Sequence, residues 1–199
     1  MAIVVEHEKR RYEILERALD IFVEEGYEDA TFQKIADRCG ITRTTLYLYF
    51  KNKREIFIWS IKQLTDRLEK DLRETIVTDS LSYAKRLEYV LHTIIDRCTD
   101  NRRLFNVVLT YLLQVQKTGK DPDSRVKRRT IRLRHLLSQL LIAGKKAGEF
   151  KDFNVKDANE LFYGLIESAI FRIAILDRSC ADDVKQALSL AVVSISIST

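Results

Sequence analysis

Proline and glycine are scarce in this chain, and their scarcity restricts the possible folds more than any other feature of the sequence. The 199 residues include one proline and six glycines. Hairpins and β-sandwiches need frequent turns, and these two residues are the strongest markers of turns. In addition, 46% of the residues are apolar and 32% are charged, a balance typical of a soluble globular protein. The sequence therefore predicts an all-α fold built mainly from long helices.

The cysteines and the apolar segments exclude several other classes. Cys39, Cys98 and Cys180 are widely separated and show no paired spacing, so we expect reduced core residues, with no disulfide framework and no metal site. No segment reaches the eighteen consecutive apolar residues of a membrane-spanning helix. We expect a cytoplasmic protein that needs no cofactor and no membrane.

Two short helices near the N-terminus follow a longer one. An amphipathic pattern over residues 8–25 ends at Gly26, where a left-handed residue stops a helix most easily. In "TFQKIADRCG", Thr31 can cap a two-turn helix that Gly40 closes. Thr42 then caps a second short helix, and Ile41 can pack on Leu46 as a hydrophobic staple. This arrangement is typical of a helix-turn-helix, with the first long helix as the third wall of its core.

The remainder predicts longer helices, which start at recognisable caps. Asp121 precedes Pro122, and Asn154 and Ser179 are each followed three residues later by an aspartate. The expected helices cover residues 53–78, 81–98, 101–117, 122–147, 155–177 and 182–197, which brings the total to about nine. We predict a helix-turn-helix domain over residues 1–52 and a second helical domain over residues 53–199.

Charge changes sign within the N-terminal part of the chain. Residues 6–30 carry four basic and nine acidic side chains, whereas residues 31–54 carry six basic and one acidic. A focused basic region is expected of a surface that meets phosphates. A solvated basic face would explain the charge equally well.

The segment "ITRTTLYLYFKNK" places large side chains on the outside of a short helix. With Leu46 at the centre of the buried side, the 100° step puts Phe50 beside it, while Thr44 and Leu48 point away and Thr45 and Tyr47 lie on the flanks. In a DNA major groove, an apolar side chain can meet a thymine methyl group, and arginine can reach a guanine edge. The alternative is that the aromatic residues cover a neighbouring domain or a partner protein.

The stretch "TFQKIADRCGITRTTLYLYFKNKREIF" resembles the N-terminal signature of the TetR family of transcriptional repressors. The resemblance is close over residues 8–58 and extends to the rest only by length, helix count and the "GEF" turn. It implies DNA contacts of two kinds. The base-facing residues are Gln33, Arg43, Thr44 and Leu48, and the phosphate-facing residues are Thr31, Thr45, Tyr47, Tyr49 and Lys53. Because Tyr49 stands where many members carry histidine, the base preference does not transfer.

The resemblance also implies a dimer formed by the last two long helices, and both helices carry apolar residues at suitable spacing. The interface candidates are Leu165, Ala169, Ile173, Leu188, Val192 and Ile195. The alternative is that both helices are simply the interior of a monomeric bundle.

The resemblance further implies an effector cavity among the central helices, so that residues 53–199 would form an effector-binding and dimerisation domain. Its candidate residues are Tyr89, His92, Phe105, Tyr111, His135, Phe162 and Tyr163. Their composition favours an apolar or aromatic small molecule, although such side chains are more often ordinary core residues. The run from Lys117 to His135 holds eight basic and two acidic residues. This run is typical of a solvated helix face. Binding of an anionic effector or of an acidic partner is the minor alternative.

These features together predict a homodimeric, ligand-responsive repressor of a palindromic operator in double-stranded DNA. A helical enzyme is disfavoured, because the chain has three histidines without metal spacing and no glycine-rich phosphate loop. A helical adapter that binds proteins through the aromatic stripe remains the other alternative, and activation in place of repression stays open.

Overall fold

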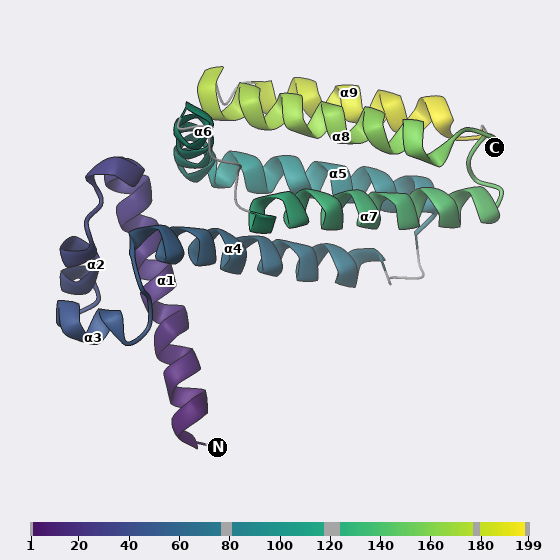
Figure 1. The fold of residues 1–199 in the computed structure, drawn as a ribbon. Coiled ribbons are helices and arrows are strands. Elements are labelled where there is room, and N and C mark those ends of the chain that lie inside the picture. Colours follow the sequence, from purple (N-terminus) through teal and green to yellow (C-terminus); the bar gives the residue numbers. More distant parts are fainter. Residues whose placement is uncertain (1, 77–80, 118–123, 177–179, 198–199) are drawn as a thin grey trace. The chain divides into compact units, whose positions relative to one another are not determined.

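The computed structural model describes residues 2–76, 81–117, 124–176 and 180–197, and Figure 1 traces them. These residues form nine α-helices and one turn of π-helix, and an isolated bridge between Phe150 and Ser196 is their only β-pairing. The expected all-α fold is confirmed. None of the helices in the described ranges combines the length and apolarity needed to cross a membrane.

The chain divides into two compact units. Unit 1 contains residues 1–67 and 107–126, and unit 2 contains residues 68–106 and 127–199. Helices α4 (Lys53–Ile76) and α6 (Arg102–Lys117) each contribute residues to both units. The functional boundary expected between residues 52 and 53 is a different division and stays a prediction.

Unit 1 is organised around α1 (Ala2–Asp29), α2 (Phe32–Arg38) and α3 (Arg43–Tyr47). Helix α1 begins six residues earlier than the sequence predicted, but the expected break at Gly26 is confirmed, because its φ of 85° and ψ of 169° interrupt the helix. Gly40, with a φ of 65°, makes the tight turn between α2 and α3, where other residues would be strained. The core of this unit joins the buried side chains of the three helices to those of α4 and α6, including Phe22, Leu46, Phe50, Phe57 and Tyr111.

Unit 2 is a helical bundle that contains α5 (Tyr83–Asp100), α7 (Ser124–Lys146), α8 (Val155–Phe171) and α9 (Cys180–Ile195). A turn of π-helix, Arg172–Leu176, extends α8. Helices α8 and α9 lie side by side, and α5 packs against both (Figure 1). The buried core draws on α5, α7, α8 and α9, with Leu87, Leu137, Phe162 and Leu188 among its fully enclosed side chains.

Local signals in the sequence explain where most helices start. The side chains of Thr31, Thr42 and Asn154 accept hydrogen bonds from backbone N–H groups of the first turn, as expected of N-caps. The caps expected at Asp121 and Ser179 lie outside the described residues. All three cysteines are buried and none forms a disulfide among the described residues, and burial raises the pKa of the Cys98 thiol to about 12.

Candidate nucleic-acid interface

The helix-turn-helix presents one side of α3 to solvent and buries the other. Leu46 and Phe50 are 0% and 1% exposed, whereas Tyr47 is 50% and Leu48 is 74% exposed. Thr44 is exposed beside Leu48. The orientation expected from the helical repeat is therefore confirmed. A leucine exposed to this degree adds little stability to the free protein, and its side chain is available for a contact outside the chain.

The polar residues at the helix starts are held by local bonds. Thr31 Oγ1 accepts from the backbone N–H of Lys34 at 3.2 Å, and Thr42 Oγ1 accepts from that of Thr45 at 3.0 Å. The Thr42 and Thr45 hydroxyl oxygens lie 2.8 Å apart. Because a hydroxyl both accepts and donates, these caps leave Thr31 able to donate to a phosphate oxygen. Its predicted phosphate contact stays a prediction, as does that of Thr45.

The aromatic residues of the interface are supported by neighbours. Arg43 donates from Nη2 to the Tyr47 hydroxyl at 3.2 Å, and Tyr47 packs on Phe32 with ring centroids 4.6 Å apart. Tyr49 stacks on His7 of α1, with centroids 4.6 Å apart and an interplanar angle of 22°. The side chains predicted to face DNA are therefore positioned before any ligand is bound.

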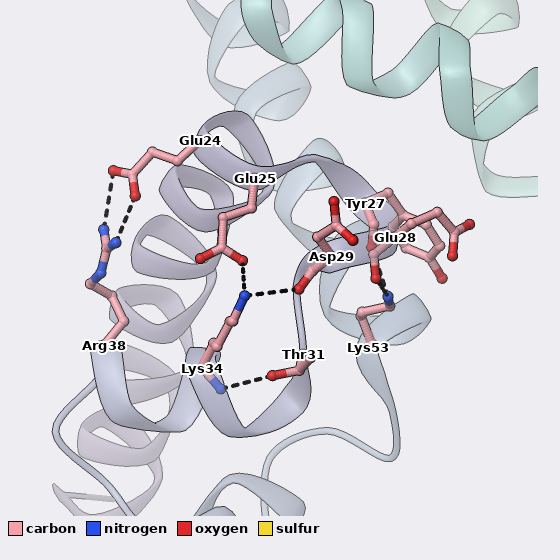
Figure 2. Close-up of polar contacts among 9 residues, drawn as sticks. All are labelled: Glu24, Glu25, Tyr27, Glu28, Asp29, Thr31, Lys34, Arg38 and Lys53. Atoms are coloured by element: carbon pink, nitrogen blue, oxygen red, sulfur yellow. Dashed lines mark hydrogen bonds and ion pairs between the residues drawn. The ribbon is translucent and has the colours of Figure 1, made fainter.

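The basic residues of α2 are paired with acidic residues near the end of α1 (Figure 2). Arg38 donates to both carboxylate oxygens of Glu24, at 2.6 and 3.2 Å, and Lys34 lies 2.8 Å from a carboxylate oxygen of Glu25. The hydrogen bond lowers the pKa of Glu24 and raises that of Arg38. The positive charge of residues 31–54 is thus partly neutralised by the acidic end of α1. Arg43, Lys51 and Arg54 are also exposed cations of this segment.

Two predicted DNA contacts are engaged within the chain. Gln33 donates from Nε2 to Asp37 Oδ1 at 2.7 Å, in the same exposed helix, where the bond is readily exchanged for a base edge. Lys53, expected to face a phosphate, donates instead to the backbone carbonyl oxygens of Tyr27 and Glu28 at 2.7 and 2.9 Å (Figure 2). The cause is that the last turn of α1 presents carbonyl groups that have no partner within the helix.

The seven cavity candidates do not form a common lining. Tyr111 belongs to unit 1, where Arg54 Nε donates to its hydroxyl at 3.0 Å, and the other six lie in unit 2. Tyr89 is 52% exposed, and His135 is exposed as well.

The remaining candidates mostly have partners or a place in the core. His92 bonds Ser189 Oγ at 3.0 Å, Phe162 is buried, Tyr163 lies under the Arg134 guanidinium at 4.1 Å, and Phe105 packs partly buried against the core. Sequence periodicity places a residue on a helix but does not say which helices meet.

One buried polar residue of unit 2 was not singled out from the sequence. Asn159 is 5% exposed, and its Nδ2 donates to the Arg134 carbonyl oxygen at 2.6 Å and to Ser138 Oγ at 2.5 Å. Its Oδ1 has no hydrogen-bond partner among the described residues. A buried acceptor left unpaired costs about 1–3 kcal/mol, so this atom is a place where a donor group of a ligand or a water would be stabilised.

The structure corrects the predicted interface residues. Ala169, Ile173, Leu188 and Val192 are 0–4% exposed within a single chain, and Leu165 and Ile195 are only partly exposed. Helix α8 is apolar on two sides, and the sequence prediction selected the inner side. The apolar residues exposed on α8, on the π-helical turn and on or just after α9 are Leu161, Phe171, Ile175, Leu190, Val193 and Ile197. We call these six residues the α8–α9 face.

Residues 118–123 of the basic run from Lys117 to His135 lie outside the described residues, and the side chains up to residue 130 are not described either. Near the end of the run, Arg132 Nη1 lies 3.4 Å from Glu69 Oε2, and Arg134 forms an ion pair with Glu160. Both ion pairs are exposed, which agrees with the interpretation that the basic run forms a solvated face of α7.

Comparison with known proteins agrees with this geometry. Residues 14–58 match the family model described as bacterial regulatory proteins, tetR family. The fatty acid metabolism regulator protein of Bacillus subtilis is 24% identical over 163 residues, which cover 79% of this chain and 80% of that protein. The solved structures with the same fold include a TetR transcription regulator from Haloarcula marismortui, with a TM-score of 0.85, 21% identity and coverage of 96% and 100%. Another is the regulator FadR of Bacillus subtilis in complex with stearoyl-CoA, with a TM-score of 0.70, 21% identity and coverage of 90% and 98%.

Proposed function

This chain belongs to the TetR family of bacterial regulatory proteins, and we propose that it is a homodimeric repressor of a palindromic DNA operator. The repressor releases the operator when it binds a small molecule that has a long apolar chain. The family consists of DNA-binding transcription regulators, so the enzyme and adapter alternatives are set aside. We place the protein in the cytoplasm, where it meets its operator.

The observation that carries the proposal is the outer side of α3. Leu48 is 74% exposed while Leu46, two residues earlier, is fully buried. Arg43 and Thr44 stand on the same exposed part of the first turn. The N-terminal turn of a recognition helix is where base contacts concentrate. There arginine suits a guanine edge, threonine suits the edge of any base, and leucine suits the thymine methyl group.

A dimer is supported by the α8–α9 face. Gly164 and Ser168 lie exposed between Leu161 and Phe171, and with them included the exposed positions 161, 164, 168, 171 and 175 follow at three- and four-residue spacing. Leu190, Val193 and Ile197 are likewise spaced by three and four residues. Small residues permit close approach of a second helix, and contiguous exposed apolar residues mark an interaction site. Two subunits would then place their α3 helices in successive major grooves, about 34–36 Å apart.

The effector is proposed to carry an acyl chain. An acyl chain is a narrower choice than the apolar or aromatic molecule expected from the sequence. Two similar proteins support it, namely a relative named as a fatty acid metabolism regulator and a structural neighbour in complex with stearoyl-CoA. The core of unit 2 is dominated by aliphatic side chains, which suit such a chain, and Asn159 Oδ1 is a candidate acceptor for a polar group. An allosteric coupling of about 1–3 kcal/mol changes operator affinity by about 5- to 150-fold.

The test uses a DNA duplex that the purified protein itself selects from a random-sequence pool. Fluorescence anisotropy measures its affinity from 50 to 300 mM salt, with and without stearoyl-CoA. We expect a steep loss of affinity with salt, as phosphate neutralisation requires, and release of the duplex by stearoyl-CoA. Coenzyme A without an acyl chain is the matched control and should leave the complex intact.

The outcomes separate the parts of the proposal. If no selective duplex emerges, the operator-binding role is wrong for this chain. If a duplex is bound but stearoyl-CoA does not weaken the complex, the acyl effector is wrong and the DNA-binding role stands.

A further inference from the structure

The first residue of α4 is bound to the last turn of α1. Lys53 Nζ donates to the carbonyl oxygens of Tyr27 and Glu28 at 2.7 and 2.9 Å, and it lies 4.6 Å from the centroid of the Tyr27 ring (Figure 2). Lys53 is only partly exposed. An ammonium group has three donors, and two of them are used on backbone acceptors.

A second lysine binds the same turn from another helix. Lys34 of α2 donates to the carbonyl oxygen of Asp29 at 3.3 Å and pairs with Glu25 at 2.8 Å (Figure 2). The carbonyl groups of three consecutive residues at the end of α1 are thus held by ammonium groups from α2 and α4. This turn is therefore the joint at which α1, α2 and the start of α4 are fixed to one another.

The residue that follows Lys53 makes a further link within unit 1. Arg54 Nε donates to the Tyr111 hydroxyl of α6 at 3.0 Å. Tyr111 packs against Tyr27 and Phe57, with ring centroids 4.7 and 4.9 Å away. Tyr27 is partly buried among these rings, and burial raises its pKa to about 12. The first two residues of α4 are thus attached to α1 on one side and to α6 on the other.

We propose that Lys53 is a positioning residue, which fixes the start of α4 to the last turn of α1 and so sets the orientation of α2 and α3, and that it is not a phosphate contact. The proposal rests on the DNA-binding role proposed above. A lysine that left this turn for a phosphate would strip two carbonyl oxygens of their donor. A movement of α4 would reach α1 through the same bond, which gives the effector a route to the recognition helix.

The decisive experiment compares Lys53→Met with Lys51→Met. Methionine keeps most of the apolar stem and removes the ammonium, and Lys51 is an exposed lysine two residues earlier that makes no such carbonyl contact among the described residues. Affinity for the selected duplex is measured as a function of salt. The affinity falls with salt, and each lysine–phosphate ion pair contributes about 0.9 to the magnitude of the slope of log K against log salt. A dimer that loses two of these ion pairs therefore has a slope whose magnitude is smaller by about 1.8.

The positioning role predicts that Lys53→Met binds the duplex about 10-fold more weakly at every salt concentration, with the slope of the parent. Its melting temperature should fall, while that of Lys51→Met stays at the parent value. A slope whose magnitude is smaller by about 1.8 would show that Lys53 contacts phosphate and would overturn the proposal. Binding and melting equal to the parent would overturn it as well.

A measurement on the parent protein avoids any failure of the variant to fold. Lysine side chains are acylated with a water-soluble ester and the modified residues are identified by mass spectrometry, first without DNA and then with it. Lys53 should react more slowly than Lys51 in the free protein, because its ammonium is bound to two carbonyl groups. Equal rates for the two lysines without DNA would contradict the positioning role. If the parent binds no duplex selectively, the DNA-binding proposal fails first, and this labelling result still decides whether Lys53 is bound to α1.

Discussion

The sharpest test of the recognition surface compares two leucines that lie two residues apart in the same helix. Leu46 is fully buried in unit 1, and Leu48 is 74% exposed. Replacing each by alanine removes the same atoms from opposite sides of α3. The interface described above requires that one change reduces stability and the other reduces DNA affinity.

The magnitudes follow from burial. A buried leucine replaced by alanine costs about 2–5 kcal/mol, which for a chain of this size lowers the melting temperature by about 2–4 °C per kcal/mol. Complete burial of leucine is worth about 1.5–3 kcal/mol, so the covered quarter of Leu48 contributes only about 0.4–0.8 kcal/mol to the free protein. If DNA covers the exposed part, Leu48→Ala loses about 1 kcal/mol per subunit, or about 30-fold in the Kd of a dimer.

Circular dichroism melting and anisotropy on the selected duplex measure the two effects, at a temperature where both variants are folded. We expect Leu46→Ala to melt at least about 4 °C lower, and Leu48→Ala to melt within about 3 °C of the parent and to bind weakly. If Leu48→Ala keeps its DNA affinity within twofold, the outer side of α3 does not enter the groove and the reasoning is refuted.

Two further predictions concern the dimer and pH. Leu190→Glu combined with Val193→Glu should sediment as a 23.2 kDa monomer and lose DNA binding, because these side chains are 70% and 67% exposed in one chain, whereas Leu188→Glu should unfold it. A folded dimer in the double variant would exclude the α8–α9 face. The hydrogen bond from Arg38 holds the pKa of Glu24 below 4.5, so its contribution to stability is present at neutral pH and is lost as the pH falls through the lowered value. The difference in melting temperature between the parent and Glu24→Gln, small at pH 7, should therefore shrink at pH 3.5, and a difference that grows on acidification would contradict this sign.

Much of the fold was readable from short-range signals. Thr31, Thr42 and Asn154 were recognised as caps and Gly26 and Gly40 as breaks, because a cap or a left-handed turn depends on a few adjacent residues. The buried and exposed sides of α3 followed from the helical repeat alone. The base- and phosphate-facing residues all lie on exposed or partly exposed positions, and their contacts with DNA stay predictions.

The sequence prediction is wrong for residues whose burial depends on which helices pack together. Ala169, Ile173, Leu188 and Val192 are core residues of unit 2, because an apolar helix with two apolar sides does not encode which side a neighbour of the same chain will cover. Tyr111 was placed with a cavity, yet it closes the aromatic cluster of unit 1 through Arg54.

By itself the sequence determined the helices, their ends and the outward side chains of α3, since each of these depends on residues within one or two turns. Only the tertiary structure decided that the acidic end of α1 neutralises the basic residues of α2 and that Lys53 holds α1. Those contacts join residues 9–26 positions apart, and which ion pair or carbonyl group a long flexible side chain reaches is set by the packing of the helices that carry it.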